Sequence, residues 1–183
     1  MKPTLAALVA ALVIPAAALA APATTVLPAG QGAELVFVHP AGWHAKASHG
    51  AHGGNVTFVA ADQGDFRIVI EAMRRVAGMP ATDAELEAGV RRSGEAMLPT
   101  ATQTALEITR VKGEQASGYL YHLTDRNPEK GAGDYRELRG GAVAVGPWFL
   151  TVEVLTHSDD EATVAEALAT LAGITYREGA ARP

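Results

Sequence analysis

Histidine is the residue type in this sequence whose spacing could support chemistry. Four of the six histidines, His39, His44, His49 and His52, fall within 14 residues. Imidazole is the commonest nitrogen ligand of transition metals, and such a set without thiolates would suit Cu(II) or Zn(II). His49 and His52 share a short glycine-flanked segment and are the strongest candidate ligands, followed by His44 and then His39. The alternative, which the sequence favours, is a solvated Gly-rich loop, because no carboxylate–His pair or helical spacing supports a site.

A second candidate for chemistry is the run His157, Ser158 and Asp159. The members of a Ser-His-Asp triad normally converge from separate segments, so adjacency in the sequence does not indicate one. Ser158 followed by Glu161 instead has the spacing of a capping box and predicts the start of a helix. The sequence also has no Gly-x-Ser-x-Gly elbow. We therefore expect no catalytic residue and no residue that binds an organic cofactor.

Composition restricts the partners and the chemistry further. A chain of 183 residues with 48% hydrophobic residues is expected to form one globular domain. The 15 basic and 20 acidic residues give a net charge of -5, which provides no general attraction to phosphate backbones, so we expect no nucleic-acid partner. The absence of cysteine from the sequence excludes disulfides, a cysteine nucleophile and thiolate metal sites.

Residues 1–20 have the pattern of a secretory signal peptide. A positive start precedes a mostly apolar run, and Ala18 and Ala20 fit the small-residue rule for cleavage before Ala21. The alternative, an uncleaved anchor, is disfavoured because the apolar run is short for a membrane span. We therefore expect a periplasmic or secreted protein with no membrane span after signal removal. The Ala-, Thr-, Pro- and Gly-rich segment 21–33 is expected to be a flexible leader.

Residues 34–176 are expected to form a single domain, followed by a frayed tail at 177–183. Capping boxes at Thr82 and Ser158 each precede an apolar stripe of helical spacing, and the second stripe predicts burial of Val164, Leu168 and Leu171. Residue composition, alternation and turn signals predict strands at 34–39, 55–60, 66–71, 104–112, 117–124, 136–145 and 148–156.

The connections between these strands are mainly of the hairpin type. We therefore expect an α+β fold in which two principal helices pack on a mainly antiparallel sheet. Strands and helices do not alternate one for one, which argues against a doubly wound parallel fold.

Two segments and the order of the elements resemble the PsbP-like superfamily. An early strand leads into Pro40-Ala41-Gly42-Trp43, and the last helix ends in the segment 168–174, Leu-Ala-Thr-Leu-Ala-Gly-Ile. The resemblance covers about residues 34–174 and implies an α/β/α sandwich. It also implies a binding or accessory role, because this superfamily has no shared catalytic set that could be transferred to this chain.

The sequence thus leaves two functions open. The first is an exported, non-catalytic binding or accessory domain, whose partner would be another protein, such as one of the cell envelope. The second is a periplasmic protein that binds Cu or Zn through the segment from His39 to His52. No other cofactor is expected.

Overall fold

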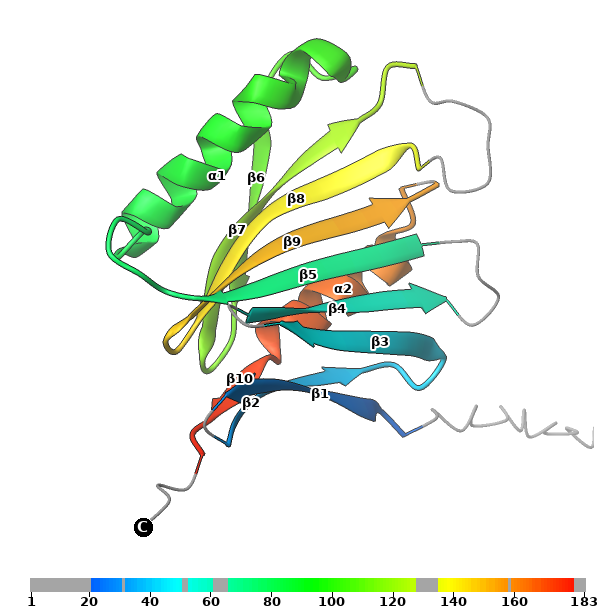
Figure 1. Cartoon of the computed structure of the whole chain (residues 1–183). Helices are drawn as coiled ribbons and strands as arrows, with labels where there is room; N and C mark the ends of the chain where they lie inside the picture. The colour runs from blue at the N-terminus through cyan, green and yellow to red at the C-terminus, as the bar shows by residue number, and fades with distance from the viewer. Residues whose placement is uncertain are drawn as a thin grey trace, which may run out of the picture.

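The computed structural model describes residues 21–30, 32–50, 53–60, 66–127, 135–157 and 159–179. A seven-stranded sheet is covered on one face by helix α1 and on the other by helix α2 and a small three-stranded sheet (Figure 1). The mainly antiparallel α+β fold expected from the sequence, with a helix on each face of the sheet, is confirmed.

The strand order of the large sheet is β3-β4-β5-β9-β8-β7-β6, and that of the small sheet is β1-β2-β10. All the strand pairs are antiparallel. The elements are β1 (Ala23–Gly30), β2 (Ala33–His39), β3 (Trp43–Gly50), β4 (Gly53–Ala60), β5 (Phe66–Arg74), α1 (Asp83–Met97), the 3-10 helix η1 (Leu98–Thr100), β6 (Glu107–Lys112), β7 (Ala116–Thr124), β8 (Glu137–Val145), β9 (Trp148–Thr156), α2 (Glu161–Ala172) and β10 (Thr175–Arg177).

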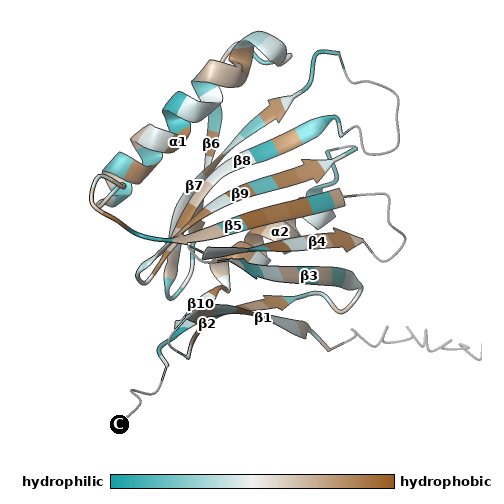
Figure 2. Ribbon diagram, viewed as in Figure 1, coloured by the Kyte–Doolittle hydropathy of each residue, from teal (hydrophilic) through white to brown (hydrophobic). Residues whose placement is uncertain are grey.

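Alternation along the strands separates two hydrophobic cores. Phe58 on β4 and Ile70 on β5 point to the α2 side, where both are fully buried. On the opposite face, Tyr121 on β7 packs with Leu86 and Val90 of α1. Figure 2 shows the corresponding mixture of hydrophilic and hydrophobic residues along α1 and long hydrophobic stretches on β5. Burial of one large apolar side chain contributes about 1.5–3 kcal/mol, so these two cores hold the helices on the sheet.

The first helix begins where the sequence predicts. The Thr82 hydroxyl accepts a hydrogen bond from the Glu85 amide, and the Glu85 carboxylate accepts one from the Thr82 amide, which completes the capping box. The backbone amides of Ala81 and Thr82 both donate hydrogen bonds to the Glu85 carboxylate and hold its pKa below the ordinary value. The N-terminal end of α1 is therefore fixed by local hydrogen bonds.

The second helix begins later than the sequence indicates. Its N-cap is Asp160, whose carboxylate accepts hydrogen bonds from the Ala162 amide and the Thr163 hydroxyl. Asp160 displaces the expected Ser158 because a carboxylate two and three residues before these donors reaches both of them. Ser158 itself lies outside the described residues.

The Asp160 cap is expected to make part of the stability of the fold dependent on pH. The Thr163 hydroxyl and the Ala162 amide lower the pKa of Asp160 from 3.8. Because the folded value is the lower one, this contribution is present above about pH 4 and is lost as the pH falls through the folded pKa. The variant Asp160→Asn keeps an N-cap acceptor but cannot titrate there. Its Tm should therefore fall less than that of the parent between about pH 5 and pH 2, and equal slopes would contradict this role.

The small sheet includes parts of both chain ends that were expected to be without regular structure. Part of the segment 21–33, expected as a flexible leader, forms β1 and pairs with β2 from Ala23↔His39 to Gly30↔Ala33. The β-branched residues of this segment favour a strand, and Leu27 is buried in the core below the large sheet. Arg177, placed in the frayed tail, pairs with Glu34 in β10. Residues 180–183 lie outside the described part of the chain.

The lengths and compositions of the helices decide whether one of them could span a membrane. Within the described residues, no helix is both long enough and apolar enough to span a membrane. Residues 1–20, which carry the signal-peptide pattern, are outside that range.

Candidate functional site

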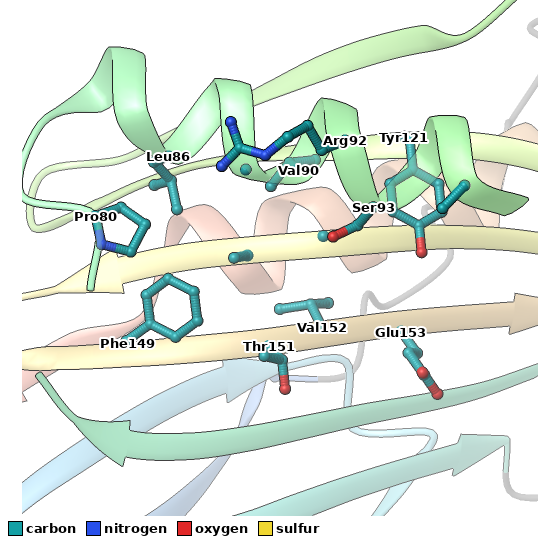
Figure 3. A pocket seen from close by; sticks show the side chains of 14 residues that line it. Pro80, Leu86, Val90, Arg92, Ser93, Tyr121, Phe149, Thr151, Val152 and Glu153 are labelled. Carbon is teal, nitrogen blue, oxygen red and sulfur yellow. The ribbon is translucent and has the colours of Figure 1, made fainter. Parts of the chain in front are cut away.

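A cavity of about 720 Å³ lies between α1 and the sheet, over strands β7, β8 and β9 (Figure 3). Its volume falls within the range of pockets that hold small organic molecules. Leu86 and Val90 of α1 form one wall, and Tyr121 and Phe149 contribute aromatic rings from the sheet. The cavity therefore has the size and the apolar lining of a ligand site.

The hollow arises from small residues on β8. Gly140, Ala142 and Ala144 alternate along the face of β8 that is turned toward α1, as their pairing with β7 shows. These small residues of β8 are flanked by larger residues on the neighbouring strands, Tyr121 on β7 and Phe149 on β9. Leu138 is the large side chain of β8 on this face, and beyond it this face of the strand bears only hydrogen or methyl side groups from Gly140 to Ala144, so part of the space between α1 and the sheet is left unfilled.

Glycine at position 89 of α1 enlarges the same space. A Cβ at Gly89 would meet no atom closer than Nη2 of Arg92, at 4.0 Å. By contrast, a Cβ at Gly94 would lie 2.7 Å from Cδ2 of Leu106 and 2.8 Å from Cγ of Tyr121, so packing requires glycine there. A glycine within a helix costs about 1 kcal/mol relative to alanine. At Gly89 no neighbouring atom would exclude a larger residue. The missing side chain therefore leaves the cavity wall open.

A tyrosine and a carboxylate lie in one row across the cavity floor. Tyr121 on β7 pairs with Gly140 on β8, and Gly140 pairs with Glu153 on β9. A Cβ at Gly140 would collide with the phenol ring of Tyr121, so the ring lies across β8 at this point. The Tyr121 hydroxyl donates a hydrogen bond to Sδ of Met97 at 3.2 Å. Burial raises the pKa of Tyr121, and the negative charge of Glu153 raises it further.

The remaining polar groups of the cavity come from α1. Ser93 lies near the end that holds Tyr121 and Glu153, whereas the Arg92 guanidinium extends over Gly89 toward Leu86 (Figure 3). Among the ion pairs of the described residues, none involves Arg92 or Glu153. The cavity thus has charged groups of opposite sign on different walls.

The first of the predicted metal ligands, His39, is a buried structural residue. Its Nδ1 donates to the carbonyl oxygen of Pro40 at 3.0 Å, and its Nε2 lies 2.9 Å from the hydroxyl of Thr25. The imidazole also stacks on the ring of Trp43, with centroids 6.3 Å apart. Both ring nitrogens therefore have partners, and Trp43 packs in the core as the sequence indicated.

His44 and His49 lie on a strand rather than on a loop. His44 and His49 are both in β3, which pairs with β4 along its whole length. Five residues of a strand span about 17 Å and end on the opposite face, so these two imidazoles point to different sides. Within the described residues, no three His, Asp or Glu side chains are grouped to hold a metal. His52 lies outside these residues, and its pairing with His49 stays a prediction.

His157 and Asp159, from the run that resembles a catalytic triad, contact Tyr135 and Arg139 respectively. His157 stacks on Tyr135 at a centroid distance of 4.7 Å, and Asp159 accepts a hydrogen bond from Arg139. This bond from the Arg139 guanidinium lowers the pKa of Asp159. These contacts tie the segment before α2 to β8.

A polar cluster on the α2 side of the sheet is absent from the sequence predictions. The buried carboxylate of Glu137 on β8 contacts the neighbouring strand β7, where Oε2 lies 3.0 Å from Nε2 of His122 and accepts a hydrogen bond from the Thr124 hydroxyl at 2.7 Å. Two other buried polar atoms, Nη1 of Arg139 and Oγ1 of Thr156, have no hydrogen-bond partner among the described residues. The contacts of Glu137 link β8 to β7, and the cluster does not line the cavity beneath α1.

Glu153, Tyr121 and Gly89 are the cavity residues that the sequence predictions omit. One sequence signal marks Glu153, which is the only charged residue within β9. A second signal is the Gly140-Gly141 pair inside a strand, which indicates close approach of another group. Neither signal shows that α1 lies above Glu153 and the Gly140-Gly141 pair, because the position of α1 depends on the packing of distant segments.

Comparisons with known proteins bear on the fold. No protein-family model matches the sequence, and the comparison with curated proteins gives no match. Among solved structures, the chain is similar to the solution structure of cyanobacterial PsbP (CyanoP) from Synechocystis sp. PCC 6803. The TM-score is 0.48 and the sequence identity 17%, over 88% of this chain and 95% of that chain. The protein matched is a PsbP, the family that the sequence resembles, and a match at this identity concerns the fold alone.

Proposed function

We propose that this protein is an exported binding domain that holds a small, largely apolar molecule beneath α1. The observation that carries the proposal is the cavity of about 720 Å³, with aliphatic and aromatic walls and a few polar groups. Cavities of this kind bind ligands by burying apolar surface, while the polar groups orient the ligand. Binding without chemical conversion accounts for each group described at the site.

One part of this proposal rests on the sequence. Export rests on the signal-peptide pattern of residues 1–20. A partner protein in the cell envelope was expected from the family resemblance. The cavity beneath α1, which is partly open to solvent, has a volume that favours a small molecule as the ligand of this particular site.

A neutral fluorescent dye tests whether the cavity binds apolar molecules. N-phenyl-1-naphthylamine is apolar and becomes bright on leaving water. We expect saturable binding to the purified protein with one site and a Kd of roughly 10–100 μM, typical of a ligand of this size. The variant Gly89→Leu places an isobutyl group in the open wall and should weaken binding about tenfold or more.

The matched control changes the neighbouring residue of the same helix. Ala88 is exposed and does not line the cavity, so Ala88→Leu adds a similar side chain outside the site. This variant should bind the dye as the parent does. Both variants should remain folded, because leucine favours the helix at least as well as glycine and nearly as well as alanine. Equal dye binding by Gly89→Leu and the parent would place the dye elsewhere and contradict the proposal.

A further inference from the structure

The two ends of the cavity differ in character. Phe149, Leu86 and Pro80 gather at one end, whereas Tyr121, Ser93 and Glu153 lie at the other (Figure 3). The first end offers only apolar side-chain surface from these three residues. The second end combines an aromatic ring with a carboxylate and a hydroxyl, which are groups that recognise a polar or charged part of a ligand.

The strand register shows which charges lie at the floor of the cavity. Glu153 belongs to the row that begins with Tyr121, and Glu71 on β5 pairs with Thr151 in the next row. Both carboxylates are on the α1 side of the sheet, and both residues are exposed. Arg67, the basic residue of β5 on this face, pairs with Leu155, which does not line the cavity. Glu153 is therefore the carboxylate that lines the cavity on the sheet side, and Glu71 lies one strand beyond the lining.

The Arg92 guanidinium does not cancel this charge at the Tyr121 end. It extends over Gly89, from the exposed side of α1, toward the apolar end. Glu153, by contrast, is fixed in the middle of a central strand. Glu153 pairs with Gly140, over which the Tyr121 ring lies, and Glu153 and Tyr121 both line the cavity.

We infer that the ligand of this cavity is an apolar amine whose ammonium group lies against Glu153 and the ring of Tyr121. The inference rests on the proposed function and names its ligand class. A cation is attracted by the face of an aromatic ring as well as by a carboxylate, and the two attractions reinforce each other. The apolar body of the amine extends toward Phe149 and Leu86, where it is removed from water.

Three molecules with the same phenylbutyl body test the inference. They are 4-phenylbutylamine, 4-phenyl-1-butanol and 4-phenylbutyrate, which present a positive, a neutral and a negative group at pH 7. Their affinities are measured by displacement of N-phenyl-1-naphthylamine from the purified protein. We expect the amine to bind roughly three- to tenfold more tightly than the alcohol, as is typical of a partly solvated ion pair with an aromatic contact. The advantage should shrink as salt is added, because ions screen the carboxylate.

The variant Glu153→Gln keeps the shape of the side chain and removes its charge. It should bring the Kd of the amine to that of the alcohol and leave the alcohol unchanged. The matched control is Glu166→Gln, which makes the same change of net charge at an exposed position of α2, on the other side of the sheet. This control should retain the full preference for the amine.

The possible failures separate the two proposals. If the alcohol and the amine bind equally, or if Glu153→Gln leaves the preference intact, the inference is overturned while the cavity remains a ligand site. If the butyrate binds most tightly and Arg92→Gln removes that preference, the cavity recognises an anion and the inference is again overturned. If the dye itself does not bind, the proposed function fails and the inference fails with it.

Discussion

Replacing Leu171 by alanine is expected to lower the free energy of unfolding by about 2–5 kcal/mol. Leu171 lies on α2 with its side chain 0% exposed, within the core formed by the α2 face of the large sheet and the small sheet. Removal of a buried isobutyl group loses its transfer free energy and leaves a cavity that rigid neighbours fill only in part. Urea or guanidinium unfolding measures the difference, provided that the m-value stays constant.

Leu168 provides a matched control on the same helix. The sequence stripe predicted that it would be buried with Leu171, yet it is only partly buried and packs at the border of the core. Leu168→Ala should therefore cost clearly less than Leu171→Ala. Equal losses, or a loss below about 1 kcal/mol at Leu171, would contradict the placement of α2 on the sheet.

The second large effect is expected at Glu137. Its carboxylate is 6% exposed and contacts both His122 and Thr124 through Oε2. Glu137→Ala removes this shared partner and leaves the two polar groups without it in a partly buried setting. We expect a loss of about 2–4 kcal/mol in the free energy of unfolding, since hydrogen bonds to a charged group are stronger than neutral ones.

The isosteric variant distinguishes hydrogen bonding from charge. Glu137→Gln retains an oxygen acceptor that can face His122 and Thr124, so it should lose about half as much as the alanine variant. Its amide group would, however, face the guanidinium of Arg136, whose Nε lies 3.6 Å from the other carboxylate oxygen. If both variants were as stable as the parent, the cluster would make no net contribution to the fold.

Local sequence patterns predicted most of the fold because they reflect local physics. The capping box at Thr82 sets the start of α1, and alternation in 66–71 and 148–156 identifies the central strands. The patterns failed where pairing with a neighbouring strand, rather than the composition of the segment itself, decides the structure. β1 becomes a strand because β2 pairs with it, and the exposed β3 is held by β4 although seven of its eight residues are exposed.

The histidines His39, His44 and His49 show that residues close in sequence need not lie together in the fold. His39 is held by Thr25, which is 14 residues away along the chain, and His44 and His49 are separated by the geometry of an extended strand. The cavity could not be located from the sequence for the opposite reason. Gly89, Gly141 and Glu153 are far apart in the chain, and they line one cavity only because α1 packs across β7 and β8.

The most direct test of ligand binding beneath α1 is an amide chemical-shift titration of the ¹⁵N-labelled protein with 4-phenyl-1-butanol. Glycine amides usually lie in an uncrowded part of the spectrum, and the cavity is bordered by Gly89 on α1 and by Gly141 on β8. If the cavity is the site, the largest saturable shifts belong to these glycines and to Glu153. Gly30 and Gly32, beside the small sheet, should not move. Shifts centred on β1, β2 and β10, or no saturable shift at any of the cavity residues, would contradict the account.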